Sequence, residues 1–439
     1  MKRNFLRLFL LPLAMGLAAS TTAQTAESLS LNEALERVEK GNAALRMADV
    51  EHRISSAQYR QTDAIFLPQV SVGYTAMVTN NPLNAFGFLL QQSGVTMESF
   101  NPATLNHPDA TELYNTSLDV KMPLFNLDMI YARKGAKAME NVSRHKAAYT
   151  REHLRFETQK AYTQLQFAYR AKAVLEQTLA DVKTIRQTVA NFEAQGLAQR
   201  SDVLNADVQV NTIEAALAKA NSNIANASEG IALLMGMETT NGVLFRPAEL
   251  ETLQGNAGAE FSTDRADVQA MTAALEATNQ MARSATAAFV PKVNAFGTYQ
   301  LNNSKPLAFK NDSYMVGVNL TWQVFQGNQN RYKARAARLQ ADKMREELQL
   351  HIDRSRVETE KLNRDLLDLN VEIRKQQASV TQAEEALRII RDRHAEGLAS
   401  ATDLLQAQAQ LSQHQLGLAQ TIMQHNIAQY QQLLLTSTN

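Results

Sequence analysis

The chain carries two patterns of apolar positions in succession, one with the spacing of a helix and one with that of a strand. Residues 29–66 place apolar side chains at helical spacing, and Pro68 ends that pattern because the residue before proline avoids helical geometry. Apolar and polar residues then alternate over 70–78 and again over 114–122, on either side of an Asn- and Pro-rich segment, 80–112. We expect a helix, then a β-hairpin at 69–123 whose strands are joined by a long loop.

A much longer helical pattern follows the hairpin. It covers 127–194, and no proline interrupts the chain between Pro123 and Pro247. A helix of that length is about 100 Å long at 1.5 Å per residue, which implies coiled-coil packing rather than a compact core. A glycine-centred break and a second helical pattern over 202–234 come next. The sequence therefore predicts a long antiparallel helical hairpin with its tip near 196–202.

The second half of the chain repeats the first. Four anchors pair in consistent order: Gly196 with Gly397, Phe125 with Phe325, Pro68 with Pro291, and 42–45 with 265–268. The offset falls from 223 residues at Pro68 to 200 at Phe125, so the first copy carries 23 extra residues, which fall in the 80–112 loop. We therefore expect a second β-hairpin at 292–325, long helices at 330–395 and 403–435, and a second tip near 397–403.

These patterns divide the chain. Residues 1–23 have the charged, apolar and small-residue order of a signal peptide with cleavage near Ala23, whereas the alternative is an N-terminal core helix. The first repeat is placed at 24–243, an irregular connector at 244–262 and the second repeat at 263–439. The expected fold class is mainly α with a small β portion, in which duplicated helical hairpins accompany two β-hairpins.

Composition narrows the function. The chain contains no cysteine, which excludes disulfides and the N-terminal lipidation that needs one, so we expect a protein that is not lipidated. Lys+Arg and Asp+Glu both number 44, so charge does not point to nucleic acid. The eight histidines lack metal-ligand spacing, and no catalytic motif is present. We therefore expect no enzyme activity, catalytic residue, metal or cofactor.

The four predicted strands have the length and alternation of strands in an outer-membrane barrel, with aromatic residues toward their ends. Four strands are too few to close such a barrel, and lipid does not tolerate the open edges of a sheet. If the strands span a membrane, several copies must therefore share one barrel. The alternative is a soluble four-stranded sheet packed on helices.

In order and duplication, the chain resembles the TolC-like outer-membrane efflux proteins. The resemblance rests on the opening 29–35, the segment 42–45, the two proline-led strands, and the Gly-Leu-Ala tips followed by an aspartate. It implies a homotrimer with a 12-stranded β-barrel and a 12-helix α-barrel in the outer membrane of a Gram-negative bacterium. It also implies a long periplasmic extension, outer-membrane lipid around the barrel, a periplasmic adaptor (membrane fusion) protein and an inner-membrane transporter.

The resemblance further implies a gate at the helical tips. Asp403 matches an acidic ring at the pore constriction, where Gln406 replaces a second acid that is common in the family. Asp202, with its neighbour Ser201, matches a tip contact for which His394 takes the partner position, and Ala399 stands where an arginine clamp is found. The implied adaptor-docking turns are Gly196, Leu197, Ala198, Gly397, Leu398 and Ala399. The alternative for both aspartates is helix N-capping, which can coexist with a pore role.

The expected function is a channel component of a tripartite efflux or type I secretion system, which passes substrates from the pump and adaptor to the exterior. The rival from another class is an oligomeric coiled-coil envelope stalk or adhesin without a conducting pore. The sequence leaves the cargo open between small molecules and proteins.

Overall fold

The computed structural model describes residues 26–237, 242–255, 258 and 260–436, so the predicted signal peptide lies outside the described residues. The chain divides into two compact units. The sheet unit consists of Arg37–Lys160, Glu251–Ser379 and Gln420–Asn439, and the tip unit of Met1–Glu36, Ala161–Leu250 and Val380–Ala419. None of the helices in the described ranges combines the length and the hydropathy that a bilayer crossing requires.

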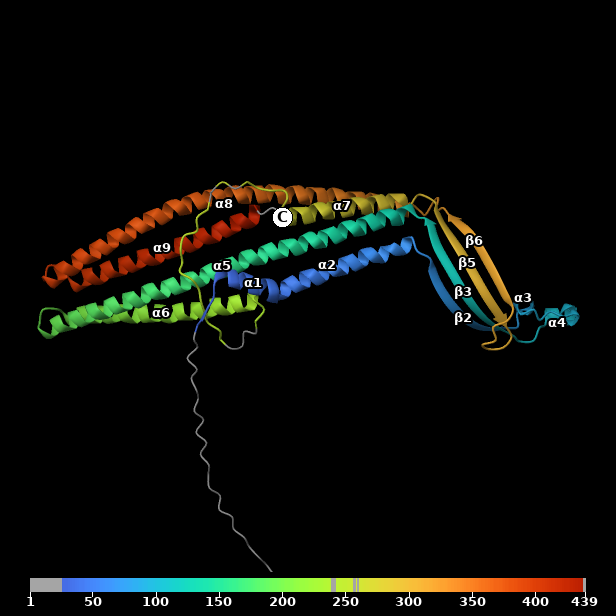
Figure 1. The fold of residues 1–439 in the computed structure, drawn as a ribbon, viewed down its shortest axis with the longest axis horizontal. Helices are drawn as coiled ribbons and strands as arrows, with labels where there is room; N and C mark the ends of the chain where they lie inside the picture. The colour runs from blue at the N-terminus through green and yellow to red at the C-terminus, as the bar shows by residue number, and fades with distance from the viewer. Residues whose placement is uncertain (1–25, 238–241, 256–257, 259, 437–439) are drawn as a thin grey trace, which may run out of the picture. The chain divides into compact units, whose positions relative to one another are not determined.

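The sheet unit contains one four-stranded antiparallel sheet. Its strands are β2 (Gln69–Thr79), β3 (Thr111–Phe125), β5 (Lys292–Asn303) and β6 (Asp312–Thr321), in the order β2-β3-β5-β6 (Figure 1). The predicted hairpins form in both halves, and β3 pairs with β5 to join them. Among the described strands, β2 and β6 therefore remain as edges with a single neighbour each.

The two faces of this sheet differ sharply in chemistry. On one face, large apolar side chains are exposed along both edge strands: Val70, Val72, Tyr74, Val78, Tyr314, Val316, Val318 and Leu320. On the other face, Thr298 Oγ1 and Ser117 Oγ donate hydrogen bonds to the Asp119 carboxylate over 2.8 and 3.0 Å. Asp119 of β3 thus bonds Thr298 of β5 across the strands, while no layer of the described residues covers the apolar side chains of the edge strands.

Four long helices form the two predicted hairpins. Helix α5 (Leu127–Ala194) is followed by α6 (Arg200–Leu234), and α8 (Gln329–Ala395) by α9 (Ala401–Thr436). The bounds of α5 and α8 agree with the sequence prediction to within one residue. The return helices begin two residues earlier than expected, so Asp202 and Asp403 are the third residue of their helices rather than the first.

The helix expected over 29–66 is wrong as a single element. It is two helices, α1 (Leu31–Gly41) and α2 (Ala43–Gln61), followed by a 3₁₀ turn, η1 (Thr62–Ile65). Asn42 separates them because its extended backbone stops α1 while its side chain accepts hydrogen bonds from the Ala44 and Leu45 N–H groups and caps α2. Its anchor partner Arg265 likewise precedes α7 (Ala266–Ala287).

The interpretation of 80–112 as a long loop also needs correction. It contains α3 (Pro82–Gln91), a 3₁₀ turn η2 (Met97–Phe100) and α4 (Pro102–Asn106). Asn81 and Asn101 cap α3 and α4 and are each followed by proline, which fits the first helical position because its missing N–H needs no partner there. The Asn-Pro pairs are thus helix starts rather than loop signals.

The connector between repeats is partly ordered. In the tip unit, β4 (Phe245–Arg246) pairs in parallel with β1 (Glu27–Ser28), and the buried Tyr162 hydroxyl donates to the Leu29 carbonyl. The same hydroxyl accepts from the Ala248 N–H. In the sheet unit, the Asn426 side chain donates to the Glu251 carbonyl over 2.7 Å. The connector has no periodic pattern of apolar residues, and polar contacts with the neighbouring helices hold it in place.

The fold class is as the sequence predicts, mainly helical with a small β portion, and the same order of a helix, two strands and a helical hairpin occurs twice. The predicted limits of the repeats and of the connector stay a prediction.

Candidate functional site at the helical tips

Both hairpin tips use the same turn. At the end of α5, the Leu197 N–H donates to the Phe192 carbonyl over 2.8 Å, and at the end of α8, the Leu398 N–H donates to the Arg393 carbonyl over the same distance. Between them in each turn stands a glycine with positive φ, Gly196 at 76° and Gly397 at 74°. This is the Schellman helix end, in which the left-handed position favours glycine.

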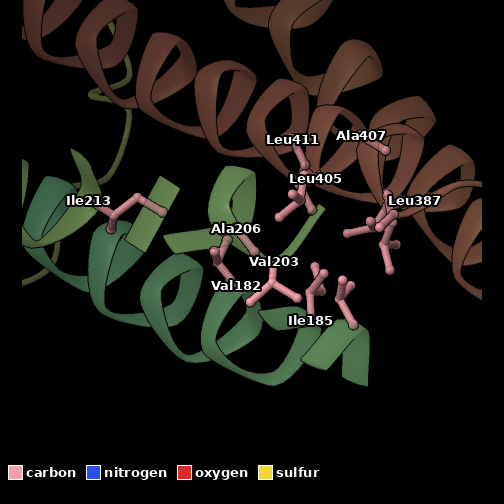
Figure 2. Close-up of a cluster of buried hydrophobic side chains, with 12 residues drawn as sticks. Val182, Ile185, Val203, Ala206, Ile213, Leu387, Leu405, Ala407 and Leu411 are labelled. Carbon is pink, nitrogen blue, oxygen red and sulfur yellow. The ribbon is translucent and has the colours of Figure 1, made fainter. Parts of the chain in front are cut away.

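A shared apolar core fixes the two tips to each other. Its buried members come from all four helices: Val182, Ile185 and Val189 of α5, Val203, Ala206 and Ile213 of α6, Leu387 of α8, and Ala401, Leu404, Leu405, Ala407 and Leu411 of α9. Figure 2 shows side chains from both hairpins directed into this cluster. The tip residues of one repeat are therefore positioned by packing against the other.

Asp403, the predicted constriction residue, is exposed and held in a capping box at the start of α9. Its carboxylate accepts hydrogen bonds from the Ser400 N–H over 3.0 Å and the Ser400 hydroxyl over 2.7 Å. These hydrogen bonds lower the pKa of Asp403 below its ordinary value; the bond from the Ser400 hydroxyl has the largest effect and the bond from the Ser400 N–H the next largest. The positive charge of Arg393 lowers the pKa further. The capping alternative is thus realised, and it leaves the side chain at the surface of the tip.

Asp202 occupies the matching position in α6 with fewer partners. Its carboxylate accepts from the Gln199 N–H over 3.1 Å, and Ser201 directs its hydroxyl to the Gln199 side chain over 3.2 Å. A glutamine thus stands where the second tip has Ser400. The two tips share their turn and differ in how tightly the aspartate is held.

Within the described residues of the single chain, Asp202 and His394 each have other partners and do not pair with one another. His394 is buried, and its Nδ1 lies 2.9 Å from the Ala399 carbonyl, which makes Nδ1 the protonated nitrogen because a carbonyl only accepts. Its ring lies against Phe192 of α5 with centroids 5.8 Å apart. Nε2 is buried without a hydrogen-bond partner among the described residues. His394 therefore closes its own turn and contacts the other hairpin through Phe192.

The remaining predicted residues lie at the surface. Gln406 is exposed one turn after Asp403 on the same helix. Leu197 and Leu398 are 73% and 64% exposed, whereas Ala198 and Ala399 are half-buried. Two exposed leucines at corresponding positions form a matched apolar pair, one on each turn.

Ser400 was not singled out from the sequence, although the Ser-x-x-Asp spacing marks a capping box. Phe192 was also missed because a partly buried aromatic near a helix end carries no distinctive signal. Within the described chain, no group of three or more His, Cys, Asp or Glu side chains is placed to hold a metal ion.

Ser400→Ala is expected to raise the pKa of Asp403. Because Ser400 lowers this pKa, the charged carboxylate stabilises the start of α9 above the unfolded-state pKa, and that stabilisation is lost as pH falls through the folded-state value. Without the hydroxyl, the loss begins at higher pH. Amide hydrogen exchange of residues 401–405 between neutral and acid pH measures it, with Thr402→Ala as the control. An unchanged pH profile in Ser400→Ala would contradict this assignment.

Comparisons with known proteins match the duplicated fold as a whole. The sequence model of the Outer membrane efflux protein family matches residues 34–237 and 260–434, once in each half of the chain. A search of curated proteins gave no significant match. Similar solved structures include the outer-membrane channel OprN, with 20% identity over 93% of this chain and 90% of that chain at a TM-score of 0.82.

Two further structures are similar over nearly the whole length. The outer membrane protein VceC from Vibrio cholerae shares 19% identity over 93% of this chain and 97% of its own, at a TM-score of 0.80. CusC, described as undergoing transmembrane channel formation, shares 17% over 95% and 96%, at 0.81. At these identities the structures establish a common fold, and the family match covers both repeats. The chain belongs to the Outer membrane efflux protein family.

Proposed function

We propose that this protein is the outer-membrane channel of a tripartite efflux or type I secretion system. The observation that carries the proposal is the four-stranded sheet, apolar and uncovered on one face, polar on the other and open at both edges. In a bilayer, the apolar face contacts lipid, and the unpaired backbone groups of each edge strand form hydrogen bonds with a neighbouring copy. Three copies supply the twelve strands that the family resemblance implies, so the working form is a homotrimer in the outer membrane of a Gram-negative bacterium.

The helices complete the conduit in this proposal. Each chain supplies four long helices with wetted outer faces and a shared apolar core, and three chains supply a ring of twelve. Substrates enter at the helical tips from an inner-membrane transporter. A periplasmic adaptor docks on the turns, where Leu197 and Leu398 offer exposed apolar contacts. The similar structures OprN and CmeC from Campylobacter jejuni are outer-membrane channels, which supports this proposal.

Planar-bilayer recording separates the channel from a coiled-coil stalk or adhesin. Purified protein reconstituted without its partners is expected to give discrete single-channel conductance steps. A stalk passes no current, so a protein that is folded and inserted but silent under all voltages would favour the stalk.

Asp403 sets the cation preference of the entrance in this proposal. One carboxylate per chain gives three charges around the constriction, because Gln406 contributes none. Asp403→Ala is expected to reduce the cation-to-anion permeability ratio, measured from reversal potentials under a salt gradient. Asp202→Ala, which removes a half-buried capping aspartate of the other tip, is the matched control. A ratio that is unchanged in Asp403→Ala would remove this residue from the constriction.

A further inference from the structure

The first turns of α8 present an arginine patch, defined here as Arg331, Arg335 and Arg338. These residues follow an i, i+4, i+7 spacing and so share one face of the helix, and all three side chains are exposed. The buried Ala334 and Ala341 pack inward from a neighbouring side of the helix, about a quarter turn around its axis from the centre of the patch. The patch therefore borders the packed side of α8, and its three side chains are exposed in the single chain.

The patch has little counter-charge of its own. Among the described residues, Arg331 and Arg335 form no ion pair, and Arg338 donates only to the Thr286 hydroxyl, over 3.3 Å. Elsewhere in the sheet unit, an arginine is paired: Arg133 of α5 lies 2.6 Å from the Asp63 carboxylate. The arginine patch is thus an unbalanced positive surface.

Helix stability does not account for it. The start of a helix carries a partial positive charge, which favours acids and disfavours cations. Helix α5 follows that rule with Asp128 in its first turn, which pairs with Lys292, whereas α8 has no acid in its first turn. Arg331, in the first turn of α8, is therefore unfavourable for the isolated helix, and an external anion would offset its repulsion from the helix start.

The start of α8, which carries the patch, lies where the sheet meets the helices (Figure 1). Trp322, just after β6, donates its indole N–H to the Phe289 carbonyl over 3.0 Å, between α7 and β5. Arg338 reaches Thr286 in the last turn of α7. Exposed aromatic side chains of Phe325 and Tyr332 stand in the same short stretch. Tryptophan and tyrosine gather where hydrocarbon meets the polar headgroups.

We propose that the arginine patch binds the anionic headgroups of phospholipids, phosphatidylglycerol in the first instance, in the leaflet on the helical side of the sheet. This inference rests on the proposed function, because it requires the sheet to span the membrane. Guanidinium groups bind phosphate oxygens in pairs of hydrogen bonds. The patch extends about 10 Å along the helix axis, and long arginine side chains reach a headgroup layer from that range.

The first repeat lacks this patch. At the offset of 200 residues, the positions of Arg331, Arg335 and Arg338 are held by Tyr131, Gly135 and Ala138. The duplication therefore predicts one anionic-lipid site per chain, always beside β6 and α7. In a trimer this gives three equivalent sites around the barrel.

The single tryptophan of the chain, Trp322, is a built-in probe. The protein is reconstituted in phosphatidylcholine nanodiscs with a trace of dansyl-labelled phosphatidylglycerol or of dansyl-labelled phosphatidylcholine. Energy transfer from Trp322 is expected to be stronger to the anionic lipid. One arginine near an anionic surface contributes roughly 1 kcal/mol of attraction, and each kcal/mol enriches the anionic lipid beside the patch about fivefold. The enrichment should fall as salt rises.

The variant R331Q/R335Q/R338Q should transfer equally to both lipids. The control K361Q/R364Q/K375Q removes the same charge from exposed positions further along α8 and should keep the wild-type preference. Equal transfer to both lipids in the wild type, or a preference that survives in the patch variant, would overturn the inference and leave the membrane-spanning sheet intact. Absence of transfer to either lipid would instead mean that the sheet is outside the bilayer, so that the proposed function falls as well.

Discussion

Val316→Arg is expected to prevent assembly of the protein in the outer membrane, whereas Met315→Arg is expected to permit it. The two residues are neighbours in β6, with 72% and 59% of their side chains exposed in the single chain, and they lie on opposite faces of the sheet. Val316 belongs to the apolar face. An arginine in the middle of a lipid-facing strand destabilises a barrel by about 2–4 kcal/mol, and each trimer would carry three.

Met315 belongs to the polar face, where its strand partner is Thr298, which bonds Asp119. An arginine at position 315 would be solvated and would lie near the Asp119 carboxylate, so the variant should assemble. Heat-modifiable migration of membrane fractions on gels measures both variants. If the sheet were soluble, both arginines would be solvated on exposed surfaces. Equal assembly of the two variants would therefore show that the apolar face does not meet lipid.

Leu405→Ala is expected to loosen the helical tips without disturbing the sheet. Leu405 is 7% exposed and lies in the core that joins both hairpins (Figure 2). Removing a buried leucine side chain costs about 2–5 kcal/mol, because apolar contacts are lost and a cavity is left. The loss falls in the tip unit, so amide hydrogen exchange should accelerate in 182–213 and 401–411 and remain unchanged in the strands.

Leu398→Ala is the control for this prediction. It removes an equal side chain from the turn beside the same core, yet 64% of Leu398 is exposed, so stability should change little. Equal acceleration in the two variants would contradict the assignment of Leu405 to the shared core. Acceleration that spreads to the strands would show that the two units unfold together.

The sequence predicted the long elements well, because long helices and alternating strands carry strong periods. Residues 127–194 have apolar side chains at helical spacing, and this spacing both predicts the helix and lets it pack. The constant offset between the two repeats then gave the positions of the second set of elements. Prediction failed where one side chain outweighs the period. Asn42 stops a helix that the apolar pattern would continue, and Asn81 and Asn101 start helices where Asn-Pro suggested a loop.

At the tips, the sequence located the residues but not all their partners. Both aspartates and both glycines lie at the positions expected from the sequence, because a turn depends on residues that are neighbours in the chain. The Asp202–His394 contact that the family resemblance implies is not present within the single chain. His394 bonds the carbonyl of Ala399, and only the three-dimensional packing of Phe192 against it reveals that choice. The pore and docking roles of the tip residues stay predictions.

The central claim is that several chains share one membrane barrel. The most direct test is the native mass of the mature protein, extracted in mild detergent and kept unheated. We expect a trimer that dissociates to monomers only on heating, because three open sheets close one another's edges. A well-folded monomer that stays soluble without detergent would contradict it, since the four strands would then lie outside the membrane and the conduit would have no wall.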